Sequence, residues 1–255
     1  MKKLLLHPRA WFLVAILALP LNAAQASPAS RAQRAFVECQ ARFQKNHEDA
    51  DAAWQFGLAC FDWSDLARDK ADRAEIAQQG IAACRQAIAR AAKGVGGHYY
   101  LALNLGQLAS TKKLGALKLV GEMETEFQTA IGLDPLFDYA GPHRSLGLLY
   151  AEAPGWPASI GSRNKARLHL RKAVELVPAY PDNSLCLLEA LLKWGEGDAV
   201  QAQLAATEQT LQKARDKFTG EKWEPSWQDW DRRWTKIKAK AGETSSHLES
   251  PSHKK

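Results

Sequence analysis

One spacing pattern occurs three times along the chain, and it limits what the chain can fold into. At each occurrence a bulky residue is followed three positions later by an alanine, and the segment stops about five positions after that. The occurrences are Cys84 with Ala87 before Ala91, Phe127 with Ala130 before Pro135, and Leu170 with Ala173 before Pro178. Because alanine lets a second helix approach closely and proline cannot continue a helix, each occurrence predicts the end of a helix packed against a neighbour.

Four further segments have the pattern of the partner helices. They are Trp54–Gly57, Tyr100–Gly106, His143–Tyr150 and Ser184–Gly195. Apolar residues recur every three or four positions over most of the chain, which indicates amphipathic helices. Helix pairs that repeat at about 34 residues are typical of the tetratricopeptide repeat (TPR). The sequence therefore predicts an all-α, TPR-like α-solenoid of about four helix pairs over residues 49–218.

Two regions flank the predicted repeats. Residues 27–48 are expected to be partly helical, and residues 219–241 to form a C-terminal helix. Four tryptophans of this helix share one face with Ile237, namely Trp223, Trp227, Trp230 and Trp234. Such a face is typical of a helix that docks on the repeats and covers their open end; the alternative is a surface that binds a partner. Residues 242–255 are polar and expected to be disordered.

The first 26 residues have the pattern of a secretory signal peptide. A cationic start is followed by a short apolar stretch and then by Ala24-Gln25-Ala26, which predicts cleavage after Ala26. An uncleaved anchor helix is the alternative. We expect an exported, periplasmic protein, without a lipid-attachment cysteine after the cleavage site and without a later membrane-spanning segment. Removing the three cations of this segment lowers the formal net charge from +6 to +3, so we expect no nucleic-acid partner.

The four cysteines lack the spacing of a zinc site or a redox dithiol. Cys60 and Cys84 fall on the two helices of one predicted pair, where a disulfide is possible; the alternative is that they are buried thiols. The chain lacks the motifs of nucleotide-binding loops, serine hydrolases and zinc proteases. We therefore expect no enzyme activity, no metal and no cofactor.

The middle of the chain resembles the T-component family of tripartite ATP-independent periplasmic (TRAP) transporters. The resemblance rests on Tyr100–Gly106, which contains Asn104, on Gly141–Arg144, and on the loop and repeat that end at Pro178. It covers about residues 51–194. It implies an α-solenoid, a trimeric assembly and a periplasmic substrate-binding protein as the partner, with Tyr100 and Asn104 among the binding residues. Members of the family are often lipoproteins, but this sequence has no lipid-attachment cysteine after the predicted cleavage site.

His143 and Arg144 allow two interpretations. They follow Pro142, a residue favoured in the first turn of a helix, so Arg144 could pair internally with Asp134 or Asp138. Alternatively both residues face a groove and bind a carboxylate, for which a guanidinium is well shaped.

The loop at residues 154–162 interrupts one predicted repeat, and we expect it to shape a binding surface with His143 and Arg144 near its base. Its Trp156 is either tucked against the repeats or exposed for binding, because tryptophans are frequent at binding hot spots. The row Arg163, Arg167 and Arg171 that follows is expected to be a solvated helix face. Two functions remain open. One is a scaffold that binds protein; the other is a module that binds a small apolar or carboxylate ligand between the helix pairs and this loop.

Overall fold

The computed structural model describes residues 27–112 and 115–248, so the predicted signal peptide lies outside the described residues. Within this part the regular structure is helical, with no β-strand. The helices are α1 (Pro28–Lys45), α2 (Ala50–Ser64), α3 (Lys70–Arg90), α4 (Val95–Thr111), α5 (Ala116–Leu133), α6 (Phe137–Glu152), α7 (Arg163–Leu176), α8 (Pro181–Lys193), α9 (Gly197–Lys217), the short 3-10 helix η1 (Glu221–Trp223) and α10 (Glu224–Leu248). None of the described helices is long and apolar enough to cross a membrane.

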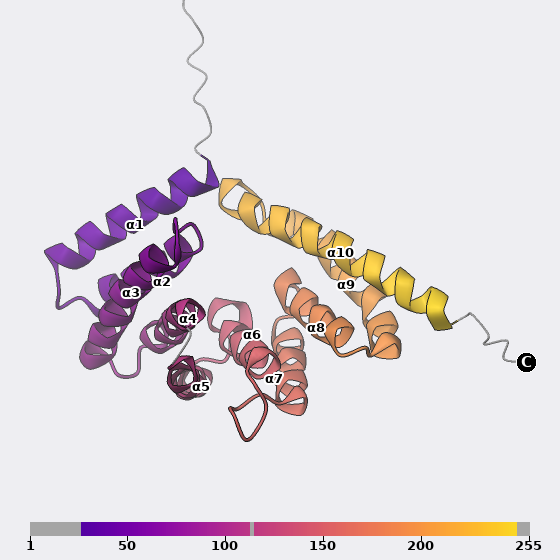
Figure 1. The fold of residues 1–255 in the computed structure, drawn as a ribbon. Helices are drawn as coiled ribbons and strands as arrows, with labels where there is room; N and C mark the ends of the chain where they lie inside the picture. Colours follow the sequence, from indigo (N-terminus) through magenta and orange to yellow (C-terminus); the bar gives the residue numbers. More distant parts are fainter. Residues whose placement is uncertain (1–26, 113–114, 249–255) are drawn as a thin grey trace, which may run out of the picture.

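The helices pack as consecutive pairs, which confirms the predicted all-α solenoid. Helices α2 and α3, α4 and α5, α6 and α7, and α8 and α9 are neighbours. Figure 1 shows an arc in which α2, α4, α6 and α8 lie on the inner side, while α3, α5 and α7 lie on the outer side. Helix α1 packs on α2 at one end of the arc, and α10 packs on α8 at the other.

Small residues bring the paired helices together, as the sequence predicts. Gly147 on α6 and Ala173 on α7 are both buried. A Cβ built on Gly147 would lie 2.8 Å from the Cγ of Leu170 and 3.1 Å from its backbone nitrogen. Since real Cβ atoms essentially never come this close, a side chain at Gly147 would push α7 away.

Of the two alternatives for Cys60 and Cys84, the structure has the buried free thiols and not the disulfide. They do lie on the two helices of one pair, α2 and α3. However, Cys84 sits opposite Gly57, because a Cβ built there would overlap its Sγ. Gly57 lies three residues before Cys60, and Cys60 belongs to a separate aromatic cluster with Phe36 and Phe56. The helix register therefore places Gly57 directly against Cys84.

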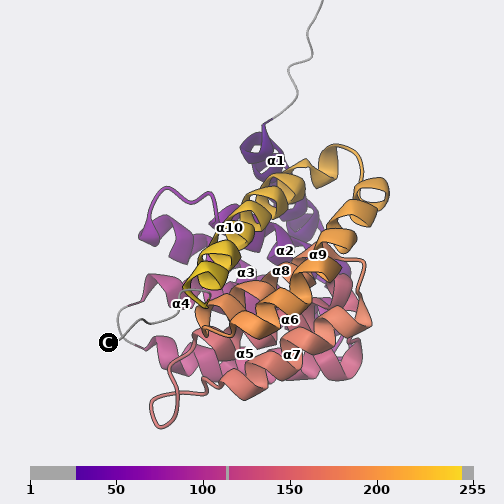
Figure 2. The same cartoon turned by 90° about the vertical axis from the view of Figure 1, so that its right-hand side faces the viewer.

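Helix α10 uses its aromatic face to pack on the C-terminal repeat. Trp230 is buried, and the indole Nε1 of Trp227 donates to the Phe218 carbonyl at 2.7 Å. Figure 2, viewed from the side of α10, shows the helix running obliquely across the front of the array. The helix continues to Leu248, beyond the Gly242 at which we expected order to end. Residues 249–255 lie outside the described residues.

Candidate functional site

An apolar groove lies on the inner side of the arc, between α2, α4, α5 and α6. It has a volume of about 360 Å³. Its lining is mostly aliphatic and aromatic: Phe61, Leu103, Gly106, Gln107, Met123, Phe127, Ser145, Leu148, Leu149 and Glu152. Concave, mostly apolar sites with a few polar groups are typical of binding sites. The groove is therefore the first candidate for a binding site.

Acidic side chains stand beside this groove at the end of α2. Asp62 follows Phe61 of the groove lining and has no hydrogen-bond or cationic partner among the described residues. Solvent reaches its side chain, but protein surrounds it on most sides. This desolvation raises the pKa of the Asp62 carboxyl to about 7, and the nearby Asp65 and Asp138 add repulsion. Asp65 accepts a hydrogen bond from the Gln107 amide at 2.8 Å. The apolar floor of the groove is thus followed along the chain, at the end of α2, by the two acidic residues Asp62 and Asp65.

Tyr100 and Asn104, which the family resemblance proposes as binding residues, are buried under the inner surface. The Tyr100 ring stacks on Trp54 with centroids 5.7 Å apart. The Asn104 amide donates to the carbonyls of Gly57 at 2.9 Å and of Tyr100 at 2.8 Å. Its Oδ1 faces Gly80, where a Cβ would overlap it. Both residues therefore hold α2, α3 and α4 together, and neither lines the groove.

The start of α6 contains an unusual backbone turn. Three consecutive residues are left-handed: Asp138 (φ 47°), Tyr139 (φ 56°) and Ala140 (φ 63°). This conformation costs about 1–2 kcal/mol for each residue other than glycine, so neighbouring groups must hold it. The Tyr139 carbonyl accepts hydrogen bonds from Arg144 Nη1 at 3.3 Å and Asn183 Nδ2 at 3.1 Å. The right-handed part of α6 follows, with Pro142 in its first turn.

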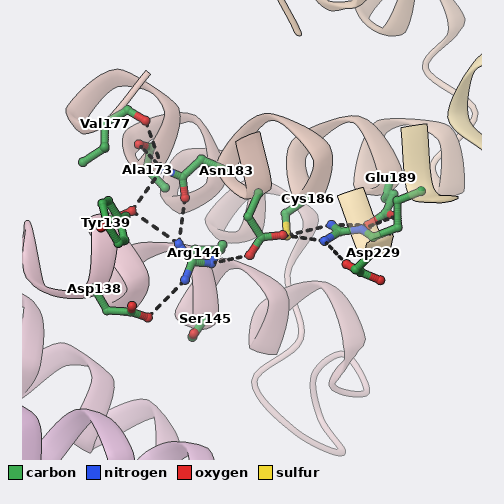
Figure 3. Close-up of polar contacts among 12 residues, drawn as sticks. Asp138, Tyr139, Arg144, Ser145, Ala173, Val177, Asn183, Cys186, Glu189 and Asp229 are labelled. Carbon is green, nitrogen blue, oxygen red and sulfur yellow. Dashed lines mark hydrogen bonds and ion pairs between the residues drawn. The ribbon is translucent and has the colours of Figure 1, made fainter. Parts of the chain in front are cut away.

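Arg144 is the centre of a polar network that joins α6 to α8 (Figure 3). Its side chain is buried. In addition to the Tyr139 carbonyl, it donates to Asn183 Oδ1 at 2.9 Å and to Asp138 Oδ2 at 3.3 Å, and its Nε lies 3.1 Å from Asp182 Oδ2. The structure thus has the internal pairing with Asp138. Because Arg144 is buried and these four contacts use most of its donors, its guanidinium does not face a ligand-binding surface.

A second arginine, Arg233 on α10, extends this network. Arg233 pairs with the same Asp182 that Arg144 contacts. It also donates to both carboxylate oxygens of Glu189, at 2.9 and 2.8 Å, and to Asp229 at 3.2 Å. One carboxylate therefore bridges two arginines and ties α6, α8 and α10 together.

The carboxyls of the network respond differently to burial. Burial alone would raise the pKa of Asp182, but Arg144 and Arg233 outweigh it and hold that pKa below the usual value. For Asp138 burial is the stronger effect, and its pKa is raised despite Arg144 and the hydrogen bond from Tyr99. This cluster holds helices α6, α8 and α10 together, because each charged group in it is paired with a group of opposite charge.

His143 separates from Arg144 and turns toward α7. Its Nδ1 lies 2.9 Å from the Nδ1 of His169, so at most one of the two nitrogens can carry a proton in this contact. Burial lowers the pKa of His143 to about 4, and His169 and Lys172 contribute to the same shift. The predicted pair His143 and Arg144 is thus split between two sides of α6. No group of three or more histidine, cysteine, aspartate or glutamate side chains in the described part of the chain could hold a metal ion.

The loop at residues 154–162 holds Trp156 out in solvent, with 88% of its surface exposed. Of the two alternatives for this tryptophan, the structure has the exposed one. The base of the loop is a small pocket of about 280 Å³ between α6, α7 and α8, and residues on its wall include Tyr150, Arg163 and Lys193. Arg144 is absent from this wall. The expected binding surface with His143 and Arg144 near the base of the loop is therefore not assembled, since neither residue lines this pocket.

Sequence reasoning missed three members of the network: Asp182, Asn183 and Arg233. Asp182 and Asn183 follow Pro181, which starts α8. A polar pair in the first turn of an otherwise apolar helix was the available signal. Arg233 gave no such signal in the sequence, because the charged residues of α10 fit the solvent-facing side of an amphipathic helix. It contacts α8 only because of the angle at which α10 crosses that helix.

Comparisons with known proteins support the fold. The family model "Regulator of microtubule dynamics protein 1-3" matches residues 22–148, just under half of the chain. A solved structure, the thermophilic TPR protein TTC0263 of Thermus thermophilus, superimposes with a TM-score of 0.60 at 19% identity; the match covers 81% of this chain and 90% of that one. MamA gives a TM-score of 0.47 at 13% identity, with coverage of 74% and 96%. No curated protein sequence matches this chain.

The likeness to TTC0263 shows a TPR-like fold. Solenoids of stacked helix pairs present an extended concave surface. The finer resemblance to the TRAP T-component family stays a prediction.

Proposed function

We propose that this protein is a non-enzymatic scaffold that binds a segment of another protein in its inner groove. The observation that carries the proposal is the apolar groove, whose lining residue Phe61 is followed on α2 by Asp62. An apolar side chain of the partner would fill the groove, and a neighbouring lysine or arginine would meet the acidic end of α2. Buried apolar anchors supply much of the affinity of such contacts, and complementary charge supplies specificity and speed of association.

The sequence supports a location and a partner class for this scaffold. The pattern of residues 1–26 supports export to the periplasm. The segments Tyr100–Gly106 and Gly141–Arg144 support a role like that of a TRAP T-component, with a periplasmic substrate-binding protein as the partner and a trimeric assembly. Tyr100, Asn104 and Arg144 would then contribute by shaping the array, since all three are buried.

Site-specific photocrosslinking in the cells that make the protein tests the groove. A photoreactive residue at Leu148 in the groove should crosslink to one predominant protein, and adding Asp62→Lys should remove that crosslink. Leu117, which is exposed on α5, is the matched control position. Crosslinking at Leu117 but not at Leu148, or a Leu148 crosslink that survives Asp62→Lys, would contradict the proposal.

A small-ligand module is the second candidate function, and the pocket at the base of the loop favours it. Arg163 and Lys193 on its wall could bind a small carboxylate. Lys193 already pairs with Glu152 at 2.7 Å, which weakens this candidate. Native mass spectrometry of the purified protein checks it directly: a retained small molecule, lost in Arg163→Ala, would favour the module over the scaffold.

A further inference from the structure

The loop between α6 and α7 displays a single large aromatic side chain at the edge of the molecule. Trp156 is the most exposed of the large hydrophobic residues in the described part of the chain. Figures 1 and 2 both show the loop projecting beyond the helices, next to α7. The loop residues 153–162 include no charged side chain.

The base of this loop is firmly built. The Gly161 amide donates to the Pro154 carbonyl at 2.8 Å, and the Ser162 amide donates to the Tyr150 carbonyl at 2.9 Å. The two sides of the loop are so close that a Cβ at Gly161 would lie 2.7 Å from the Pro154 carbonyl oxygen. The loop therefore presents Trp156 from a fixed base, which lowers the entropy lost on binding.

Helix α7 continues from the loop with a strongly cationic sequence. It contains five cations, Arg163, Lys165, Arg167, Arg171 and Lys172, and one acid, Glu175. Three of the cations have acidic partners: Lys165 with Glu124, Arg167 with Glu196 and Lys172 with Glu175.

The other two cations, Arg163 and Arg171, are exposed and have no acidic partner among the described residues. Leu168 lies between them in the sequence and is 66% exposed. A pocket of about 320 Å³ on this face is lined by Leu168 and Arg171, among others. Trp156, Arg163, Leu168 and Arg171 are thus exposed side chains along the loop and the helix that follows it.

We propose that Trp156 and the cationic face of α7 dock on the surface of an anionic lipid bilayer. Tryptophan is favoured at the membrane–water interface, where its ring is partly apolar and its N–H stays hydrated. Cations close to the surface gain from the negative potential of anionic lipids, and their stems lie along the interface.

The shape of the surface favours a bilayer over a protein partner. The two apolar groups, Trp156 and Leu168, stand singly on it, whereas a stable protein interface needs a continuous apolar centre. A protruding tryptophan can insert into the interface of a bilayer without a preformed pocket. A protein partner would need a pocket that matches it. The proposal does not depend on the inner groove, which is formed by other helices.

Flotation with lipid vesicles tests the proposal. The purified chain should float with vesicles of phosphatidylcholine and phosphatidylglycerol in equal parts, and added salt should weaken this binding. It should float much less with phosphatidylcholine alone. Trp156→Ala should lower the partition coefficient several-fold, and Arg163→Ala with Arg171→Ala should lower it by roughly fivefold for each cation.

Matched controls separate this effect from general charge and from misfolding. Arg34→Ala with Lys45→Ala removes the same charge from exposed positions on α1 and should leave binding unchanged. Residues 1–26 contribute equally in every comparison, because all variants carry the same N-terminus. Asp62→Lys in the inner groove should retain full vesicle binding, so failure of the groove proposal is distinguishable from failure of this one.

Several outcomes would overturn the proposal. One is that wild type and Trp156→Ala float equally well with anionic vesicles. Another is that the wild-type protein binds neutral and anionic vesicles equally well. If Trp156→Ala instead changes the mass measured by light scattering and leaves flotation unchanged, the face joins copies of this chain. If the Arg163 and Arg171 variants lose an acidic protein partner but keep lipid binding, the face binds protein.

Discussion

At the scale of single residues, Arg144 shows how one buried cation can organise a region. It contacts Asp138, Asp182 and Asn183 and the carbonyl of Tyr139. The left-handed turn depends on these contacts, because its strain must be offset by fixed neighbours. An arginine that sequence reasoning considers for ligand binding therefore has a structural role, and burial decides between the two.

Replacing Arg144 with methionine should be strongly destabilising. The change removes the cation but leaves Asp138 and Asp182 in place, so that buried carboxylates lose a partner. We expect a loss of about 3–5 kcal/mol in the free energy of unfolding, measured by urea denaturation. Arg171→Met, at an exposed position, should change it by less than about 0.5 kcal/mol. Similar effects of the two changes would contradict the assignment of Arg144.

The His143–His169 contact predicts a dependence of stability on pH. The pKa of His143 in the folded state is about 4, mainly because of burial, which is below its usual value of about 6.5. The unfolded chain therefore binds more protons, and stability falls as the pH drops from about 6.5 to about 4. Because His143 is half exposed, we expect a loss of only about 1–2 kcal/mol after solvent screening.

Comparison with His143→Gln isolates this contribution. Lys165, Lys172 and Tyr150 also face the pair, and they stay unchanged in the variant. Asp62, whose pKa is raised to about 7, has the opposite effect over the same pH range, so only the difference between the two proteins is informative. If both lose equal stability between pH 7 and pH 4, the contact has no such role.

At the scale of the helices, the repeat pattern predicts the parts of the fold that depend on local spacing. Ala130 and Ala173 are fully buried where their helices touch neighbours, because each small residue is needed at one position of the repeat. The left-handed turn at residues 138–140 could not be predicted, since it contains no glycine to mark it. The contacts of Arg233 depend on how α10 crosses α8, and that angle is set by packing between distant segments.

Enlarging a small residue at a helix contact tests the repeat register. Ala173 has no exposed surface, so Ala173→Leu should overpack the contact between α6 and α7. We expect a destabilisation of about 1–3 kcal/mol, seen as a lower midpoint in thermal unfolding. Ala205→Leu, at an exposed position on α9, should have little effect. An unchanged midpoint for Ala173→Leu would show that the register is wrong.

At the scale of the whole molecule, the arc of repeats is bridged at its two ends. Arg31 on α1 and Glu224 at the start of α10 form an ion pair at 3.5 Å, and Figure 1 shows the two helices meeting there. Helix α10 is tied in turn to α8 by Arg233. The ends of the arc around the inner groove therefore touch, although a partly exposed ion pair of this kind contributes only about 0–1 kcal/mol.

The central claim is that the groove beside Asp62 binds a partner segment with an apolar and a cationic side chain. Calorimetric titration with the protein captured by the Leu148 crosslink tests it most directly. We predict that Asp62→Lys weakens the affinity by about tenfold or more through like-charge repulsion, whereas Asp216→Lys, an exposed acid on α9, leaves it unchanged. Equal affinity of wild type and Asp62→Lys would contradict the claim.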